Sequence, residues 1–390
     1  MKLEKQPNAA EIGWVLGNRT LAYKQTSFND LITRRYSKGF WERVGADTFE
    51  YVTLNKNGEF TVGSISGSPM IFQAGASGCS TTPTRGLSFG TDSVSGNKAH
   101  ISVSFCETDL LATCFESDYT WHPNGELRLD KSVITKLTKI ILDQITSGLF
   151  LALISGSVYG GDEAKTKNGG TVETTKLFIQ TVDAHVGLTK MLSDNVGKFK
   201  NFNVQGLYKE TDQDGRRFKG SVVDIFDALT RQAEKDDLEI ASTISDDPEN
   251  ATVIVDNATY SRLKKEYAAQ CEGVGVLGKK CKDAIVKEKI GKRTVYYIHD
   301  VIVRPVSEIT FYDKFVGKTT RLMAITRKKN IVLGGSIKGR GENVTGLKLR
   351  RQDTDGGGNK YVMVADFLLL THIADSGEII ATQQHFDFKK

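Results

Sequence analysis

The chain of 390 residues has little proline, little cysteine and no long apolar run, and each shortage excludes a class of protein. With only 6 prolines, rigid proline-rich linkers between domains are not expected. The 5 cysteines are Cys79, Cys106, Cys114, Cys271 and Cys281. They are odd in number and form no CxxC pair, which argues against a disulfide framework and favours reduced thiols in a cytosolic folding environment.

Membrane segments are also missing from the sequence. The opening residues, MKLEKQPNAAEIG, contain no apolar core of a signal peptide. No stretch is apolar over the roughly 20 residues that a membrane-spanning helix needs. We therefore expect no membrane partner.

The charge of the chain is nearly balanced. Its 52 basic and 47 acidic residues leave a net charge of +5 and are well mixed along the sequence. Four short basic runs occur, at 34–38 (RRYSK), 215–219 (GRRFK), 326–330 (TRKKN) and 348–352 (KLRRQ). We interpret each first as a solvated surface. If they lined one face together, they would bind DNA without regard to its sequence.

Glycine-rich motifs of enzymes occur only in incomplete form. The GVGVLG run at 273–278 matches G-x-G-x-x-G, but a predicted helix precedes it where a dinucleotide site needs a strand. The GKT at 317–319 has Tyr312 in the place of the first glycine of a phosphate loop. GSVYG at 156–160 lacks the G-x-S-x-G pattern of a nucleophilic serine. These runs are interpreted as loops.

Metal and acid–base sites cannot be assigned either. The six histidines show no spacing typical of zinc ligands; they are His100, His122, His185, His299, His372 and His385. His185 and His372 lie in apolar periodic stretches and are predicted to be core or interface residues. The sequence therefore names no catalytic, cofactor-binding or metal-binding residue, and no cofactor.

The longest periodic stretch lies at about 131–154. Its apolar residues recur every three or four positions, which predicts one face of a helix: Ile134, Leu137, Ile141, Ile145, Leu149 and Leu153. Asp130 or Ser132 is suited to cap its start. From Leu149 to Ile154 every side of the helix is apolar, so we expect this end to be buried all round.

The first third of the chain favours extended structure. Residues 1–45 have scattered aromatic residues and no sustained period, which is typical of an arm that docks on another surface. Residues 46–108 contain short β-rich runs separated by Gly, Asn and Ser, with a long polar piece, GASGCSTTPTRGLSFGTDSVSGNK. We predict that this piece is a loop projecting towards another subunit.

Helices and strands alternate in the remainder, which predicts an α+β protein. Helices are expected at 174–194 and at 221–237, the latter capped by Ser221. A buried strand at Val253–Val255 is expected to turn at Asp256 or Asn257, either of which suits the N-cap of the next helix. Further strands are predicted at 293–306, 321–335, 360–374 and 378–388.

This order of features resembles the major capsid proteins of tailed bacteriophages, which have the HK97 fold. That family has an N-terminal arm, an extended β loop, a long spine helix and an axial domain, and its chain then returns to a peripheral domain. Four segments carry the resemblance: 221–232 with 251–267, 293–306, 321–336 and 365–383. The segment 293–306 departs from the family at Tyr297, Ile298 and His299, where glycine and proline are usual.

The resemblance implies boundaries for each part of the chain. The arm would span 1–45, the extended loop 46–108, the peripheral domain with the spine helix 109–180, the axial domain 181–339, and the returning segment 340–390. No residue matches the Lys–Asn cross-link that some members form. No scaffolding extension precedes the arm in this sequence, so the resemblance implies a separate scaffolding protein.

The implied function is structural and not enzymatic. The chain would form hexamers and pentamers of an icosahedral shell around double-stranded DNA, which it contacts without sequence specificity. Portal and possibly decoration proteins would be further partners. The protein would assemble in the host cytoplasm and reside in the virion capsid.

Two alternatives remain at this point. An encapsulin-type compartment has the same fold but holds cargo enzymes, so its shells would lack nucleic acid. A soluble enzyme that uses one of the glycine loops would be a monomer or small oligomer near 43 kDa, stabilised by its ligand.

Overall fold

The computed structural model describes residues 12–14, 21–23, 48–54, 58–67, 87–106, 119–121, 127–129, 131–157, 185–194, 221–271, 284–290, 293–338, 348–353 and 359–387. All structural statements below concern these residues.

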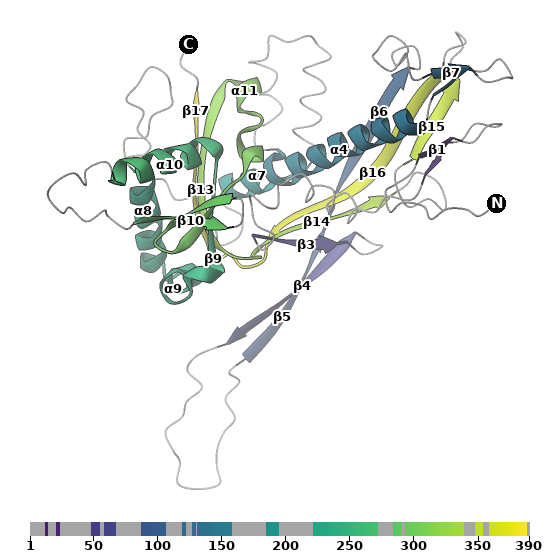
Figure 1. Ribbon diagram of the computed structural model, residues 1–390. Helices are drawn as coiled ribbons and strands as arrows, with labels where there is room; N and C mark the ends of the chain where they lie inside the picture. The colour runs from purple at the N-terminus through teal and green to yellow at the C-terminus, as the bar shows by residue number, and fades with distance from the viewer. Residues whose placement is uncertain are drawn as a thin grey trace, which may run out of the picture.

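A six-stranded sheet forms the centre of one half of the molecule (Figure 1). All neighbouring strands in it are antiparallel except β12 and β9, which are parallel. In spatial order the strands are β10 (Ile285–Ile290), β11 (Arg293–Ile298), β12 (Val301–Pro305), β9 (Ala251–Val255), β13 (Lys318–Arg327) and β17 (Ile379–Asp387).

A second sheet, of five strands, extends away from the first. The long strand β16 (Asn359–Ile373) pairs antiparallel with β15, β14 and β6, and β14 pairs in parallel with β3. The other strands are β15 (Lys348–Asp353), β14 (Ile331–Lys338), β3 (Phe49–Thr53) and β6 (Asn97–Cys106). The chain passes directly from one sheet to the other at two turns, from β13 to β14 and from β16 to β17.

Three helices pack on one face of the six-stranded sheet and enclose a core with it. They are α8 (Val222–Lys235), α9 (Glu239–Asp246) and α10 (Asn257–Cys271). Their buried residues, such as Phe226 and Leu229, meet Val253, Met323 and Ile325 of the sheet. Because this core includes residues from every layer of the unit, the unit buries its own apolar surface.

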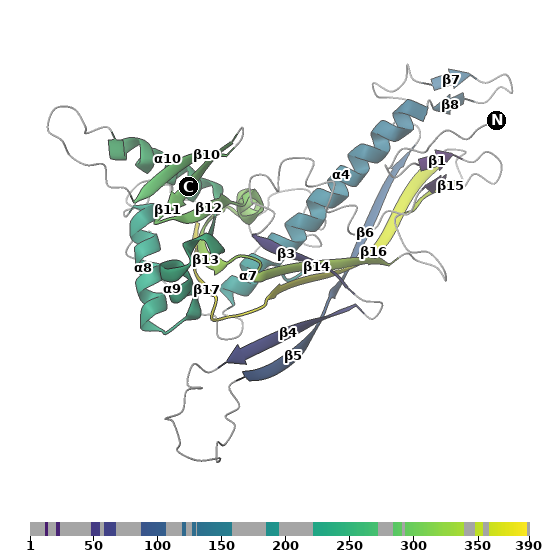
Figure 2. The same cartoon turned by 60° about the horizontal axis from the view of Figure 1, so that its bottom comes forward.

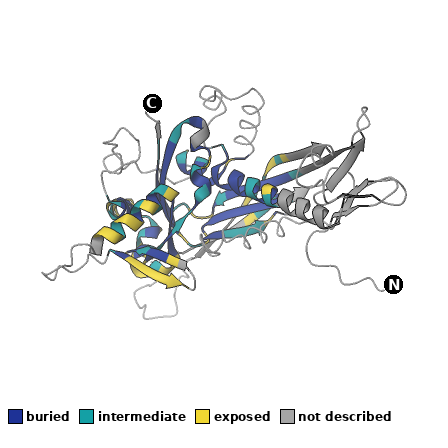
Figure 3. Ribbon diagram, turned by 45° about the horizontal axis from the view of Figure 1, so that its top comes forward, coloured by how far each residue is buried: buried dark blue, intermediate teal, exposed yellow. Residues whose placement is uncertain are grey.

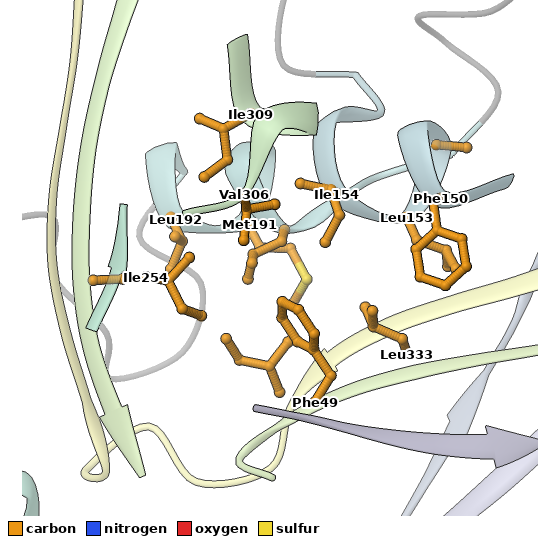
Figure 4. Close-up of a cluster of buried hydrophobic side chains, with 14 of the residues drawn as sticks. Phe49, Phe150, Leu153, Ile154, Met191, Leu192, Ile254, Val306, Ile309 and Leu333 are labelled. Carbon is orange, nitrogen blue, oxygen red and sulfur yellow. The ribbon is translucent and has the colours of Figure 1, made fainter. Parts of the chain in front are cut away.

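A second core joins the two sheets around the C-terminal half of α4 (Lys131–Ser155). Figure 4 shows Phe150, Leu153 and Ile154 of the helix pointing into this core. Ile254 of the six-stranded sheet and Leu333 of the five-stranded sheet line it from either side. Two short elements complete it, α7 (Leu188–Ser193) and η3 (Ser307–Thr310). The other short elements are α11 (Asp313–Val316), which lies against β13, and η2 (Pro248–Asn250), which lies against α9.

Three separate hairpins complete the described chain. They are β1 (Ile12–Trp14) with β2 (Leu21–Tyr23), β7 (Tyr119–Trp121) with β8 (Leu127–Leu129), and β4 (Glu59–Gly67) with β5 (Leu87–Ser95). In Figures 1 and 2 the β4–β5 hairpin extends away from both sheets.

The strongest sequence patterns are confirmed. The predicted spine helix forms α4, and Leu149 to Ile154 are each at most 8% exposed, as the all-round apolar pattern indicates. Ser221 caps α8 in a capping box with Asp224. The side chain of Asp256 accepts bonds from Ala258 N and Thr259 N and so caps α10. The caps expected at the start of α4 lie outside the described residues.

The helix predicted at 174–194 is wrong in its described part. Only Leu188–Ser193 is helical, and Gly187 is extended with φ −86° and ψ 176°. The reason is a backbone contact, because Gly187 N donates to Gly156 O at 3.0 Å beyond the end of α4. A helix at this point would remove that bond.

Two predicted strands are each a pair of strands. The segment 293–306 turns at His299 and Asp300, whose φ angles of 44° and 66° have the signs of a type I′ hairpin. The segment 321–335 turns at Lys329, with φ 62°. The polar piece predicted as a loop is also partly regular, because 87–95 and 97–106 form β5 and β6.

Candidate functional site

Among the described elements, the β4–β5 hairpin extends away from the two sheets (Figures 1 and 2). Its strands pair without a break from Glu59↔Ser95 to Gly67↔Leu87. Its contact with the five-stranded sheet lies at the base, where Phe60 and Val94 pack on Leu54, Leu368 and Leu370. Among the described side chains, the apolar contact that anchors the hairpin is therefore at this end.

Two glycines allow the hairpin base to lie close to the sheet. Gly58 has φ 82°, a left-handed conformation that glycine adopts without strain, and a Cβ there would lie 2.6 Å from Leu368 Cδ1. At Gly96 an added Cβ would lie 2.5 Å from Leu54 Cδ1. Gly96 N donates to Gly58 O at 2.8 Å, which closes the base. Sequence patterns indicate turns at these glycines but not this close packing.

The C-terminal end of α4 is held by three other segments of the chain. Thr371 Oγ1 of β16 donates to Leu153 O at 3.0 Å, and Thr189 Oγ1 of α7 donates to Ile154 O at 3.0 Å. Ser155 Oγ donates to Glu308 O of η3. The first two bonds satisfy carbonyl groups that a helix end leaves unpaired, and the third ties the helix end to η3. They fix the direction in which the rest of α4 projects.

His185 completes this junction as a neutral side chain. Its Nε2 lies 2.9 Å from Thr371 Oγ1, and since that hydroxyl donates to Leu153 O, Nε2 must carry the proton. Its Nδ1 is buried without a partner among the described residues. Burial lowers the pKa of His185 to about 4. The sequence prediction that His185 is a core residue is confirmed.

The turns between the two sheets are joined by Asn330. Its Nδ2 donates to Asp375 O at 2.9 Å and to Glu378 O at 3.1 Å, and its Oδ1 accepts from Asp375 N at 2.7 Å. The backbone adds a bond from Ala374 N to Asn330 O at 2.8 Å. One side chain thus holds the β13–β14 turn against the β16–β17 turn. No local pattern identifies such a role, because the partners are about 45 residues away.

Two buried polar clusters resemble catalytic groups but are closed to substrate. Thr320 Oγ1 lies 2.7 Å from Asp313 Oδ1 and 3.0 Å from His385 Nδ1, yet Thr320 is 0% exposed. Asp256 is also 0% exposed, and Arg321 lies 3.6 Å away. Both clusters therefore hold β13 in place and do not present a nucleophile.

The motif residues are placed as structural elements where they are described. Gly317 ends α11 with φ 67°, and Lys318 begins β13, so GKT is a helix end followed by a strand. GVGVLG lies outside the described residues. Among described side chains, no three His, Cys, Asp or Glu residues gather to hold a metal ion. None of the described helices combines the length and apolar character needed to cross a membrane.

The basic runs do not form one surface where they can be traced. The run 326–330 forms the β13–β14 turn, whereas 348–352 lies in β15 at the far end of the other sheet (Figures 1 and 2). In the turn, Arg327 lies 3.5 Å from Glu378 and Lys329 lies 3.7 Å from Glu50. The runs 34–38 and 215–219 lie outside the described residues.

No protein-family model and no curated protein matches the chain. Solved structures do match it. A chain of the satellite phage P4 procapsid, a structure that includes the size determination protein Sid, is 12% identical, with 95% of this chain and 94% of that chain covered and a TM-score of 0.50. The capsid of an empty GTA particle is 11% identical, covering 98% and 95%, with a TM-score of 0.43. The capsid of Myoviridae phage XM1 is 10% identical, covering 85% and 89%, with a TM-score of 0.41.

At 12% identity, the similarity to the P4 procapsid chain is evidence for the fold alone. It runs over nearly the whole of both chains. The predicted fold class is confirmed: the chain has an α+β, HK97-like capsid fold.

Proposed function

We propose that this chain is the major capsid protein of a tailed double-stranded DNA bacteriophage, with no enzymatic role. It self-assembles into hexamers and pentamers of an icosahedral shell. One observation supports the proposal beyond the fold: the β4–β5 hairpin extends away from both sheets (Figures 1 and 2), and its apolar contact among the described side chains lies at its base.

An isolated two-stranded hairpin is marginally stable in water and presents unpaired backbone groups along its edges. A hairpin of nine paired residues per strand therefore gains stability when a second surface covers it. A closed shell supplies that surface from an identical neighbour, and it repeats the contact at every subunit. Spreading the load over many such interfaces also suits a container that resists internal pressure.

The parts of the subunit follow the boundaries predicted from the sequence. We assign the arm to 1–45, the extended loop to 46–108, the spine helix with the peripheral domain to 109–180, the axial domain to 181–339 and the return to 340–390. Within the second range, β3 and β6 belong to the five-stranded sheet, so the free hairpin is the part from Glu59 to Ser95. Within the last range, β16 and β17 lie in different sheets, so the return connects both halves of the subunit.

The proposed role implies partners outside the chain. They are a separate scaffolding protein, a portal, possibly decoration proteins, and packaged DNA held by contacts that do not depend on sequence. The shell would assemble in the host cytoplasm and form the capsid of the virion.

Sedimentation and negative-stain microscopy of the purified 42.9 kDa protein test the proposal. We expect capsomers or shells in the megadalton range, and particles from infected or expressing cells that protect double-stranded DNA from nuclease. Shells that hold protein cargo and no nucleic acid would identify an encapsulin-type compartment instead. A monomer that never assembles and is stabilised by a small ligand would favour an enzyme.

Deleting residues 1–40 tests the arm separately. The truncated chain should show nearly the same thermal unfolding as the full chain, because the residues that build the two described cores begin at Phe49. It should assemble poorly. Normal shells from the truncated chain would refute the arm assignment.

A further inference from the structure

The unit of α8, α9 and α10 has an acidic face at one end. Residues 236–250 contain six carboxylates and no lysine or arginine: Asp236, Asp237, Glu239, Asp246, Asp247 and Glu249. All six are exposed. None takes part in an ion pair with another described residue. This acidic face is formed by the end of α8, by α9 and by η2.

The basic turn that borders the acidic face does not neutralise it. Lys328 N donates to Asn250 O at 2.7 Å, so the turn lies against η2. Its neighbours Arg327 and Lys329 are already paired with Glu378 and Glu50. Six like charges within 15 residues repel one another, and a surface of opposite charge would relieve that repulsion.

A basic face lies at the other end of the same unit, on α10 and β10. Its exposed lysines are Lys264, Lys265, Lys287 and Lys289. Lys264 Nζ lies 4.6 Å from the ring centre of Tyr260, and Lys287 Nζ lies 5.6 Å from that of Tyr267. Both rings pack edge-on against Tyr296, at 5.7 and 5.6 Å. The tyrosine cluster therefore holds lysines of two different elements on one face.

The acidic residues within α10 and β10 are engaged in other bonds. Glu266 accepts from Val222 N at 2.8 Å and from Arg262 Nε at 2.8 Å. Glu288 bonds with Tyr297, on the opposite side of the strand from Lys287. The lysines of the basic face thus remain available to an external partner.

The length of α8 separates the two faces. Glu266 of α10 binds the first amide of α8, whereas α9 follows directly after the last turn of α8. A helix of 14 residues is about 21 Å long, which exceeds the Debye length of about 8 Å at physiological salt. The carboxylates of α9 therefore do not neutralise the lysines of α10 within one chain. Figures 1 and 2 both show α9 and α10 at opposite ends of α8.

We propose that the acidic face of one copy docks on the basic face of the next, head to tail, so that charge complementarity orders the copies around a capsomer. This inference rests on the proposed shell function. A contact between two different faces of identical chains closes into a ring when the rotation between copies allows it. The edge strand β10 is exposed over most of its length (Figure 3), and its apolar residues Val286 and Ile290, 43% and 50% exposed, lie on the opposite side of the strand from Lys287. A protein partner that covers this edge would bury them as well. A nucleic-acid surface would gain nothing from them.

Two charge-reversed variants test the proposal. Lys264→Glu with Lys265→Glu makes both faces acidic, and Asp246→Lys with Asp247→Lys makes both faces basic. Each should raise the protein concentration at half assembly at least about tenfold, because like charges then meet at every contact. Mixing the two variants should restore assembly, but only in rings with an even number of copies, since the variants must alternate. The control, Lys98→Glu, reverses the charge of an exposed lysine outside both faces and should assemble within about twofold of wild type.

Salt dependence and a second pair of substitutions distinguish a loss of docking from a loss of folding. Assembly of the wild type should weaken as salt rises from 0.05 to 0.5 M, because screening shortens the reach of the charges. Lys287→Glu with Lys289→Glu should reproduce the first variant. All the substituted residues are exposed at these faces, so thermal unfolding should be unchanged.

Several outcomes would overturn the inference. Reversed variants that assemble at the wild-type concentration would do so, as would a mixture that assembles no better than its components. Normal shells of the first variant that retain less DNA would reassign the basic face to nucleic acid. If the wild type and the control both stay monomeric, the proposed shell function itself fails.

Discussion

The six-stranded sheet with its three helices and the β4–β5 hairpin differ in how much apolar surface each buries within the chain. The former encloses a core in which Phe226, Leu229 and Val253 are at most 1% exposed. The latter has two strands that extend away from both sheets (Figures 1 and 2), and its apolar contact among the described side chains lies at its base. Burial of apolar surface is the dominant favourable term in folding, so the first region gains its stability within one chain. Under the proposed function, the second region gains its stability from association with a neighbouring subunit.

Removing the hairpin is the strongest test of this difference between the two regions. Replacing 62–92 by an Asn-Gly turn joins the paired residues Thr61 and Ser93 and keeps Phe60 and Val94 at the base. We expect unfolding of the body to change by less than about 1 kcal/mol, because surface changes away from packed sites have small effects. Assembly should be abolished, which sedimentation measures.

The outcome against this prediction is shells of normal size from the shortened chain. Such shells would show that the hairpin contributes nothing between subunits. A large fall in melting temperature would instead show that the hairpin belongs to the body.

A substitution in the core that joins the sheets should have the next largest effect. Phe150→Ala removes a ring that is 0% exposed and should lower the free energy of unfolding by about 3–5 kcal/mol. Because this core positions α4, assembly should weaken together with stability. The matched control is Val286→Ala at a site 43% exposed, with a stability change below about 0.5 kcal/mol. Equal effects of the two in denaturant titrations would contradict the assigned core.

Asn330→Ala tests how much the bonds between the β13–β14 and β16–β17 turns contribute to stability, without changing the packing inside either core. It removes three bonds to the β16–β17 turn and leaves Asp375 N without its acceptor. We expect a loss of about 2–3 kcal/mol in unfolding free energy. Hydrogen exchange should accelerate at 374–378 and stay slow at 251–255. Uniform protection across both segments would argue against this role.

The pH dependence at His185 should be the smallest of these effects under ordinary conditions. Its pKa is about 4 in the folded chain and about 6.5 when exposed. Above pH 6.5 both states are neutral and stability is complete. Between pH 6.5 and 4 the unfolded state binds the proton first, so stability falls as the pH falls, by about 3 kcal/mol in total.

His185→Gln isolates this contribution, since glutamine can still donate to Thr371 without titrating. The stability difference between wild type and variant should shrink steadily from pH 7 to pH 4. A difference that is constant over this range would contradict a buried neutral imidazole.

Local signals in the sequence were enough to predict the elements that are stabilised locally. The capping pair Ser221 and Asp224, the Asp256 cap and the apolar stripe of α4 each lie within a few residues of what they stabilise. The fold class followed from their order. The turn at His299 and Asp300 was missed because Asn-Gly, the usual signal for that turn, is absent.

The junctions could not be predicted, because they join residues that are far apart in sequence. Glu266 caps α8 from 44 residues away, and Thr371 binds the end of α4 from 218 residues away. Gly187 is extended because Gly156 lies beside it, and an added Cβ at Gly156 would lie 2.0 Å from His185 O. A pattern within one segment contains no information on such partners. The two charged faces were likewise hidden within a mixed overall charge.

Sedimentation of the full chain beside the chain that lacks 62–92 is the most direct test of the central claim, that the body folds alone and the hairpin is completed by a neighbour. We predict megadalton assemblies from the full chain and, from the shortened chain, a folded species near the monomer mass that melts at the same temperature. Assembly of both chains alike, or of neither, would contradict the account.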